Sequence, residues 1–129
     1  MKFSYHWLQS YFNEPLPEPN TLANVLIFHS FEVEEVITEE DDTLLELAIL
    51  PNRRHDCLSH RGIAKEISAT LNIPMKNDPL ALRFNLNPRA EAVKISIENP
   101  KLCARYIAGY IQGVKVGPSP DWLRESLES

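Results

Sequence analysis

The chain has 129 residues, 43% of them hydrophobic and 24% charged, which is typical of a globular protein and excludes a disordered one. Its formal net charge of −5 argues against a protein that coats nucleic acid, because such proteins need a basic surface. No apolar run approaches the ~20 residues that span a bilayer. The two cysteines, Cys57 and Cys103, make no disulfide framework, so we expect a cytoplasmic protein.

Two helices are predicted near the N-terminus. Ser4 is placed to cap a short helix over residues 5–12, because a serine hydroxyl accepts a backbone N–H of the first turn. Residues 14–19 contain three prolines and read as a stiff connector, since proline cannot lie inside a helix. A second helix should run from residue 20 or 21 to about 29.

A β-hairpin is predicted next, from alternating segments at 31–37 and 43–49. Acidic residues crowd this region, and a cation site is one interpretation of them. The cluster lacks the glycine and the ligand spacing of a calcium loop, which favours a solvated edge that discourages strand pairing. The cluster comprises Glu32, Glu34, Glu35, Glu39, Glu40, Asp41 and Asp42.

The segment 50–71 combines a turn, a helix start and an apolar helix face. Asp56 is predicted to be the N-cap of a third helix. Ile63, Ile67 and Leu71 recur every four residues and give this helix a buried face.

The character of the sequence changes after residue 75. Residues 76–91 are rich in proline and asparagine without sustained periodicity, and they are the predicted linker. Alternation at 93–97 and 104–116 predicts two strands, and a helix should begin near Asp121. We expect an N-terminal domain at 1–75 and an incomplete second domain at 92–129, because the latter has too little apolar surface to fold alone.

His55, Cys57 and His60 invite two chemical interpretations. A structural zinc site needs four ligands and the usual pairs of ligands are absent, so zinc is disfavoured. A Cys57–His60 nucleophile pair has no third group to orient it, so catalysis is disfavoured as well. We expect a buried thiol between exposed histidines, and we predict neither a catalytic residue nor a metal ligand in this chain.

Arg53, Arg54 and Arg61 cluster near the start of the third helix. One interpretation is a small phosphate-binding patch, which would let the chain act as a stand-alone module that binds tRNA. The other is a set of solvated arginines that pair with the acids at 39–42. No aromatic residues alternate with the arginines, which weighs against binding of a single strand.

Three stretches, in order, resemble the β subunit of bacterial-type phenylalanyl-tRNA synthetase. The first is the N-terminal start, the second a P-N-R…D-C-L…G-(I/V)-A-(R/K)-(E/D) signature, and the third the opening of the editing region. The residues are Met1–Tyr5 with Trp7 and Leu8; Leu50–Arg53, Asp56–Leu58, Gly62–Ala64 and Glu66; and Cys103–Tyr106, Gly113, Val114, Val116, Pro118–Pro120, Trp122 and Leu123.

The resemblance implies an α+β fold: three helices and a hairpin in a winged-helix-like domain, then the first strands and helix of the editing region. It implies that an oligonucleotide-binding insert is missing after the first hairpin strand. The family charges tRNA(Phe) with phenylalanine, using ATP and Mg²⁺, and its β subunit works with the α subunit. The segment resembled here holds no catalytic residue and no cofactor. Pro51, Asn52, Asp56 and Gly62 are its expected structural motif.

Overall fold

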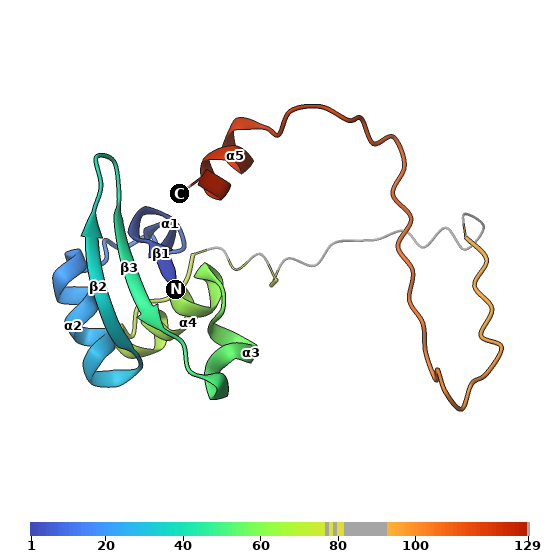
Figure 1. Cartoon of the computed structure of the whole chain (residues 1–129), viewed down its shortest axis with the longest axis horizontal. Coiled ribbons are helices and arrows are strands. Elements are labelled where there is room, and N and C mark those ends of the chain that lie inside the picture. Colours follow the sequence, from blue (N-terminus) through green and yellow to red (C-terminus); the bar gives the residue numbers. More distant parts are fainter. Residues whose placement is uncertain (77, 79, 82–92, 129) are drawn as a thin grey trace. The chain divides into compact units, whose positions relative to one another are not determined.

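The computed structural model describes residues 1–76, 78, 80, 81 and 93–128 (Figure 1). The chain divides into two units. The first consists of Met1–Leu82 with Asp121–Ser129, and the second is Arg83–Pro120. The predicted linker at 76–91 falls largely outside the described residues, so the predicted domain boundaries stay predictions. No helix among the described residues is long and apolar enough to cross a membrane.

A three-stranded antiparallel sheet forms the centre of the first unit, with the strand order β1-β3-β2. β2 spans Glu32–Thr38 and β3 spans Thr43–Ala48, so the predicted hairpin is confirmed. β1, Lys2–Ser4, pairs with the other edge of β3 and sets Phe3 opposite Leu45. The sequence did not indicate β1, because three residues are too few to show an alternation.

Two helices follow the predicted starts closely. α1 spans Tyr5–Gln9, and the hydroxyl of Ser4 accepts the N–H of Trp7, so the predicted cap is confirmed while the helix is shorter than expected. α2 spans Pro19–His29. Its first residue is the last proline of the connector, which suits a position whose N–H has no partner inside a helix.

Three consecutive elements follow the hairpin. A 3₁₀ turn, η1, spans Pro51–Arg53 and leads into the short helix α3, Arg54–Cys57. The long helix α4 spans His60–Leu71. It ends at Asn72, which adopts a left-handed conformation with φ of 55° and donates its N–H to the carbonyl of Ser68.

The predicted N-cap of α4 is wrong. Asp56 lies inside α3, and the N-cap is Ser59, whose hydroxyl accepts the N–H of Gly62 at 3.1 Å. Aspartate and serine are equally good caps, so local preference does not choose between them. The guanidinium of Arg53 holds the Asp56 carboxylate instead.

This assignment of the cap predicts unequal effects for two substitutions. Ser59→Ala should lower the free energy of unfolding by about 1 kcal/mol, because one backbone N–H of α4 loses its acceptor. Asp56→Ala should have a smaller effect, since its carboxylate caps no helix. Urea unfolding followed by circular dichroism measures both, and a larger loss for Asp56→Ala would contradict the assignment.

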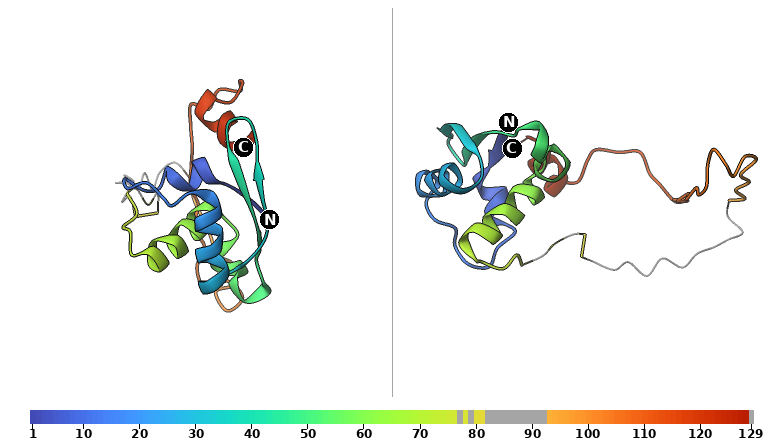
Figure 2. Two further views of the ribbon diagram at one scale, coloured as in Figure 1. Left: turned by 90° about the vertical axis from the view of Figure 1, so that its left-hand side faces the viewer. Right: turned by 90° about the horizontal axis from the view of Figure 1, so that it is seen from below.

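One hydrophobic core lies between the sheet and the helices α1, α2 and α4, which cover the same face of the sheet (Figure 2). Ile63 and Ile67 are fully buried in it, and Leu71 packs at its border, so the predicted apolar face of α4 is confirmed. The core residues are Phe3, Leu8, Phe12, Leu16, Leu22, Ala23, Leu26, Phe31, Leu45, Leu47, Cys57, Ile63, Ala64 and Ile67.

The described residues of the second half contain one regular element, α5, Asp121–Glu128, which confirms the predicted C-terminal helix. Neither of the strands predicted at 93–97 and 104–116 is formed. A strand exists only when a neighbouring backbone satisfies its N–H and C=O groups, and alternation in a sequence does not supply that neighbour. The α+β class is confirmed for the described part of the chain.

Candidate functional site

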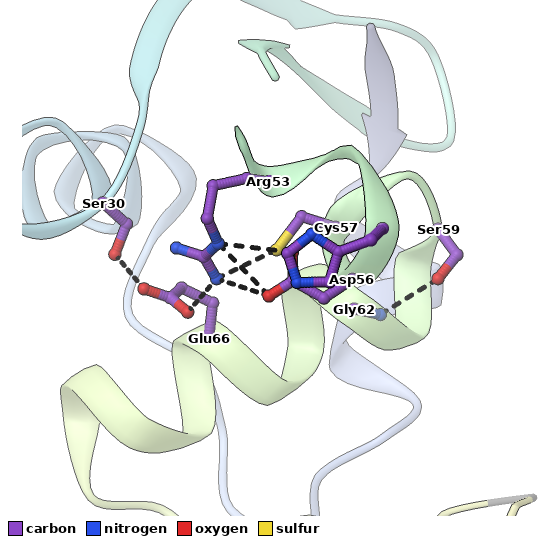
Figure 3. Close-up of polar contacts among 8 residues, drawn as sticks. Ser30, Arg53, Asp56, Cys57, Ser59, Gly62 and Glu66 are labelled. Atoms are coloured by element: carbon purple, nitrogen blue, oxygen red, sulfur yellow. Dashed lines mark hydrogen bonds and ion pairs between the residues drawn. The ribbon is translucent and has the colours of Figure 1, made fainter. Parts of the chain in front are cut away.

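Arg53 is the centre of a polar network at the junction of η1, α3 and α4 (Figure 3). Its Nη2 lies 2.7 Å from Glu66 Oε2 and 3.0 Å from Asp56 Oδ2. The same nitrogen donates to Cys57 Sγ at 3.1 Å, and the guanidinium lies 5.3 Å from the centre of the Phe31 ring. One arginine side chain thus ties together three elements that the sequence places next to each other.

Glu66 links this network to α2. Its Oε1 accepts the hydroxyl of Ser30 at 2.7 Å while its Oε2 accepts Arg53 (Figure 3). The hydrogen bond from Arg53 outweighs partial burial and lowers the pKa of the Glu66 carboxyl. Asp56 responds in the same direction, again mainly because Arg53 donates to it. Both carboxylates are therefore ionised at neutral pH and are held by the cation.

Cys57 is a buried thiol, as predicted, and not an activated one. Burial, reinforced by the neighbouring Asp56, raises its pKa to about 11. A thiol with such a pKa is protonated at pH 7 and is a poor nucleophile and metal ligand.

His60 is partly buried, which corrects the prediction of exposed histidines on both sides of Cys57; only His55 is exposed. Its Nε2 accepts the backbone N–H of Ser4 at 2.9 Å. Its ring stacks on Trp7 with the centroids 4.0 Å apart and meets Phe3 edge-on. Because Nε2 is an acceptor here, His60 is the neutral tautomer that carries its proton on Nδ1.

The structure predicts that acid weakens the fold through His60. Burial lowers its pKa from 6.5 to about 4. The unfolded chain then binds more protons between these two values. The free energy of unfolding is therefore highest above pH 6.5 and decreases as the pH falls towards 4. Because solvent screens the partly exposed imidazole, the decrease should be about 1–2 kcal/mol. The carboxyl groups whose pKa values are lowered, such as Asp42 and Glu66, lose their stabilising contribution as the pH falls below their ordinary values of 3.8 and 4.5.

Urea unfolding at several pH values between 7 and 4 measures this loss. The variant His60→Gln should flatten the profile between pH 6.5 and about 4, where the imidazole is protonated in the unfolded chain and neutral in the folded one. The control His55→Gln changes a histidine whose side chain is 77% exposed and should keep the slope. An unchanged slope in His60→Gln would contradict the assignment.

The three arginines of the predicted phosphate patch have different surroundings. Arg53 is held by Asp56 and Glu66, as described. Arg61, on α4, grips the carboxylate of Asp78 with two hydrogen bonds of 2.5 Å, which lower the pKa of Asp78 to about 2. Arg54, on α3, is exposed. One interpretation expected the arginines to pair with the acids of the hairpin turn at 39–42. Their carboxylate partners are instead Asp56, Glu66 and Asp78.

The acidic turn contains a residue whose structural role the sequence did not indicate. Asp42 accepts the hydroxyl of Ser4 through Oδ2, and its Oδ1 accepts the backbone N–H groups of His6 and Thr43 at 3.0 and 2.7 Å. Burial would raise the pKa of Asp42, but these hydrogen bonds lower it. Asp42 therefore joins the hairpin turn to the start of α1, across 38 residues of sequence.

Gly62 has a clear steric reason to be glycine. A Cβ atom built on it would lie 1.9 Å from the carbonyl oxygen of Asp56 and 2.9 Å from the Cα of Cys57. The C-terminal end of α3 thus packs directly against the backbone of α4. Of the other predicted motif residues, Pro51 opens η1 and Asn52 is an exposed residue within it.

These residues form no site with reacting groups. Cys57 is directed to Arg53 and His60 to Ser4, so they act separately and not as a nucleophile–base pair. In the described part of the chain, no group of three His, Cys, Asp or Glu residues is placed to hold a metal ion. The arrangement stabilises a turn between two helices, and its one cation is paired with two carboxylates.

Known proteins resemble the chain over most or all of its length. The phenylalanine–tRNA ligase β subunit of Anaeromyxobacter dehalogenans is 48% identical over 88 residues, which are 68% of this chain and 11% of that protein. The β subunit of Rhodopirellula baltica is 33% identical over 129 residues, 100% of this chain and 19% of that protein. That of Geobacter metallireducens is 42% identical over 88 residues.

No family model matches the chain. The chain spans between 11 and 19% of the length of these relatives. The similarity to Rhodopirellula baltica extends through the N-terminal unit and the segment after it. On this evidence the chain belongs to the phenylalanine–tRNA ligase β-subunit family.

Proposed function

We propose that the chain is a structural and assembly module of a phenylalanine–tRNA ligase β subunit and performs no catalysis itself. The observation that carries this proposal is that the Arg53 guanidinium is bound by other side chains of the same segment and of α4. This guanidinium is shared between Asp56, Cys57 and Glu66, so the charged groups of this segment stabilise its own fold. A segment that binds its own charged groups in this way leaves few of them for a substrate.

The parent enzyme would charge tRNA(Phe) with phenylalanine, and the partners of the chain would be the α subunit, the remainder of the β subunit and tRNA(Phe). ATP and Mg²⁺ would act elsewhere in that enzyme. The described residues do not fit them, since they hold no metal-binding cluster, and Arg53 and Arg61 are engaged by carboxylates. We therefore derive no catalytic step for this chain.

The finer architecture belongs to the same proposal. Residues 1–75 would be a winged-helix-like domain, 76–91 a linker, and 92–129 the start of the editing region. The shared core of α1, α2, α4 and the hairpin supports the first domain. β2 and β3 are joined by a tight turn in which the N–H of Glu39 donates to the carbonyl of Asp42. The family resemblance implies that an oligonucleotide-binding insert is missing from this chain at the turn.

The test compares two arginine variants in a complete β subunit that contains this segment. The subunit is co-expressed with the α subunit, and the yield of assembled enzyme and its aminoacylation rate per complex are measured. Arg53→Leu should reduce the yield and leave the rate per complex unchanged, because Glu66 and Asp56 lose their partner. Arg54→Leu is the matched control at an exposed position and should change neither. A normal yield with a rate at least tenfold lower for Arg53→Leu would overturn the proposal.

The alternative function, tRNA binding through Arg53, Arg54 and Arg61, has its own test. A filter-binding titration of the isolated chain with tRNA(Phe) at several salt concentrations measures the number of phosphates that are neutralised. We expect no salt-dependent binding, because Arg53 and Arg61 already contact carboxylates. Binding with a clear salt slope that Arg54→Leu reduces would favour the alternative.

A further inference from the structure

The chain turns back after α4 and is fastened to this helix at two places; we call residues 73–76 together with Asp78 the strap. At its start, the N–H of Ile73 donates to the carbonyl of Ser68 at 3.2 Å, and the Ser68 hydroxyl donates to the carbonyl of Ile73 at 2.6 Å. At its end, the Asp78 carboxylate accepts two hydrogen bonds from Arg61. Ser68 and Arg61 lie near opposite ends of α4, so the strap runs back towards the start of the helix.

Between these two places the strap contacts the residues that follow α1. Met75 forms an antiparallel β-bridge with Phe12, and the N–H of Lys76 donates to the carbonyl of Tyr11 at 2.6 Å. Ile73 and Met75 pack against the core and are partly buried, whereas Lys76 is exposed. The strap therefore covers one border of the core and joins the segment after α1 to α4.

The end of the strap depends on charge more than on burial. The strap contributes no fully buried side chain to the core, and the side chains of Arg61 and Asp78 are 25 and 26% exposed. Lys65, one turn further along α4, adds a second cation that favours the Asp78 carboxylate. Segments with few buried apolar contacts open at a lower free energy than the core does, and a paired, charge-assisted hydrogen bond is a strong contact to hold one closed.

We propose that the Arg61–Asp78 pair is the closing contact of the strap, and that the strap opens without unfolding of the core when this pair is broken. The chain continues from Asp78 towards the unit at 83–120. The closed strap fixes the point at which the chain leaves the N-terminal core, so in a complete β subunit it couples the module to the residues that follow. This coupling rests on the assembly role proposed above.

Amide hydrogen exchange of the full 129-residue chain, followed residue by residue by NMR, tests the closing contact. In Asp78→Arg the N–H of Lys76 should exchange at least about tenfold faster than in the wild type, because two like charges then meet at Arg61 and the strap opens. The N–H of Ile67, in the buried face of α4, should keep its wild-type rate, since the core stays folded.

A control and a rescue separate the pair from the charge change itself. Asp121→Arg makes the same change in the Asp121–Arg124 pair of α5 and should leave the exchange of Lys76 unaltered. The double variant Arg61→Asp with Asp78→Arg restores opposite charges and should return the exchange of Lys76 towards its wild-type rate. Unchanged exchange of Lys76 in Asp78→Arg, an equal acceleration in the core, or a double variant as fast as the single one would each overturn the proposal.

The coupling is tested in a complete β subunit that contains this segment, co-expressed with the α subunit. Asp78→Arg should lower the yield of assembled enzyme, and the double variant with Arg61→Asp should recover it. A normal yield for Asp78→Arg would overturn the coupling. It would leave the assembly role of the module standing, because that role is tested separately by Arg53→Leu.

Discussion

Replacing Gly62 by alanine is expected to lower the free energy of unfolding by about 3 kcal/mol or more. The added Cβ would stand 1.9 Å from the carbonyl oxygen of Asp56. The atoms that it meets are backbone atoms of Asp56 and Cys57, so no side-chain rotation can relieve the clash and the end of α3 must move. The loss is a large part of the 5–15 kcal/mol that holds a typical domain together.

The intrinsic helix preference favours alanine over glycine, so it should stabilise Gly62→Ala and oppose the steric effect. Alanine is favoured over glycine in a helix by about 1 kcal/mol, so a net loss in Gly62→Ala reports the steric contact alone. Ala69→Gly, at an exposed position of the same helix, measures the preference and should cost about that amount. Urea unfolding of the three proteins provides the comparison. A Gly62→Ala variant as stable as the wild type would show that the end of α3 is not packed against α4.

Gly62→Ala should also displace the hydrogen-bonding partners of Arg53. Asp56 and Cys57 are the residues nearest the added atom, and both are partners of Arg53. Gly62→Ala should therefore also expose the Cys57 thiol, which is 1% exposed in the folded chain. Faster reaction of Cys57 with a thiol reagent, measured in a Cys103→Ser background, separates this local change from global unfolding.

Local patterns predicted those features that local interactions determine. The face formed by Ile63 and Ile67 followed from their spacing, because a helix repeats every 3.6 residues wherever it packs. The cap of α4 was misplaced for a different reason. Asp56 and Ser59 both suit the position, and the choice depends on Arg53, whose side chain engages Asp56 only in the folded chain.

Features that depend on distant residues had no signal in the sequence. Asp42 looked like one more acid in a solvated turn, and its role appears only when the hairpin brings it to Ser4 and His6. β1 needed β3 as a partner, more than 38 residues away. Residues 93–97 depend on a partner in the same way: the alternating pattern is present, yet these residues form no strand. Pairing is a property of two segments, and a sequence pattern describes only one.

Truncation of Ile67 should be a costly change in the hydrophobic core. Ile67 lies on α4 and is fully buried in the one cluster that joins the sheet to α1, α2 and α4. Ile67→Ala is expected to lower the free energy of unfolding by about 2–5 kcal/mol, because the lost methylene groups leave a cavity that the backbone cannot fill. Ile67→Val removes a single methylene and should cost about 0.5–1.5 kcal/mol.

The border residue Leu71 provides the matched comparison. It lies one turn further along the same face and is only partly buried, so surrounding side chains and water can occupy the space that Leu71→Ala leaves. The loss should therefore be clearly smaller than for Ile67→Ala, although both changes remove a four-carbon side chain down to one carbon. Equal losses at the two positions, measured by urea unfolding, would mean that α4 is buried along its whole length. The core would then extend past Leu71, towards the residues that follow α4.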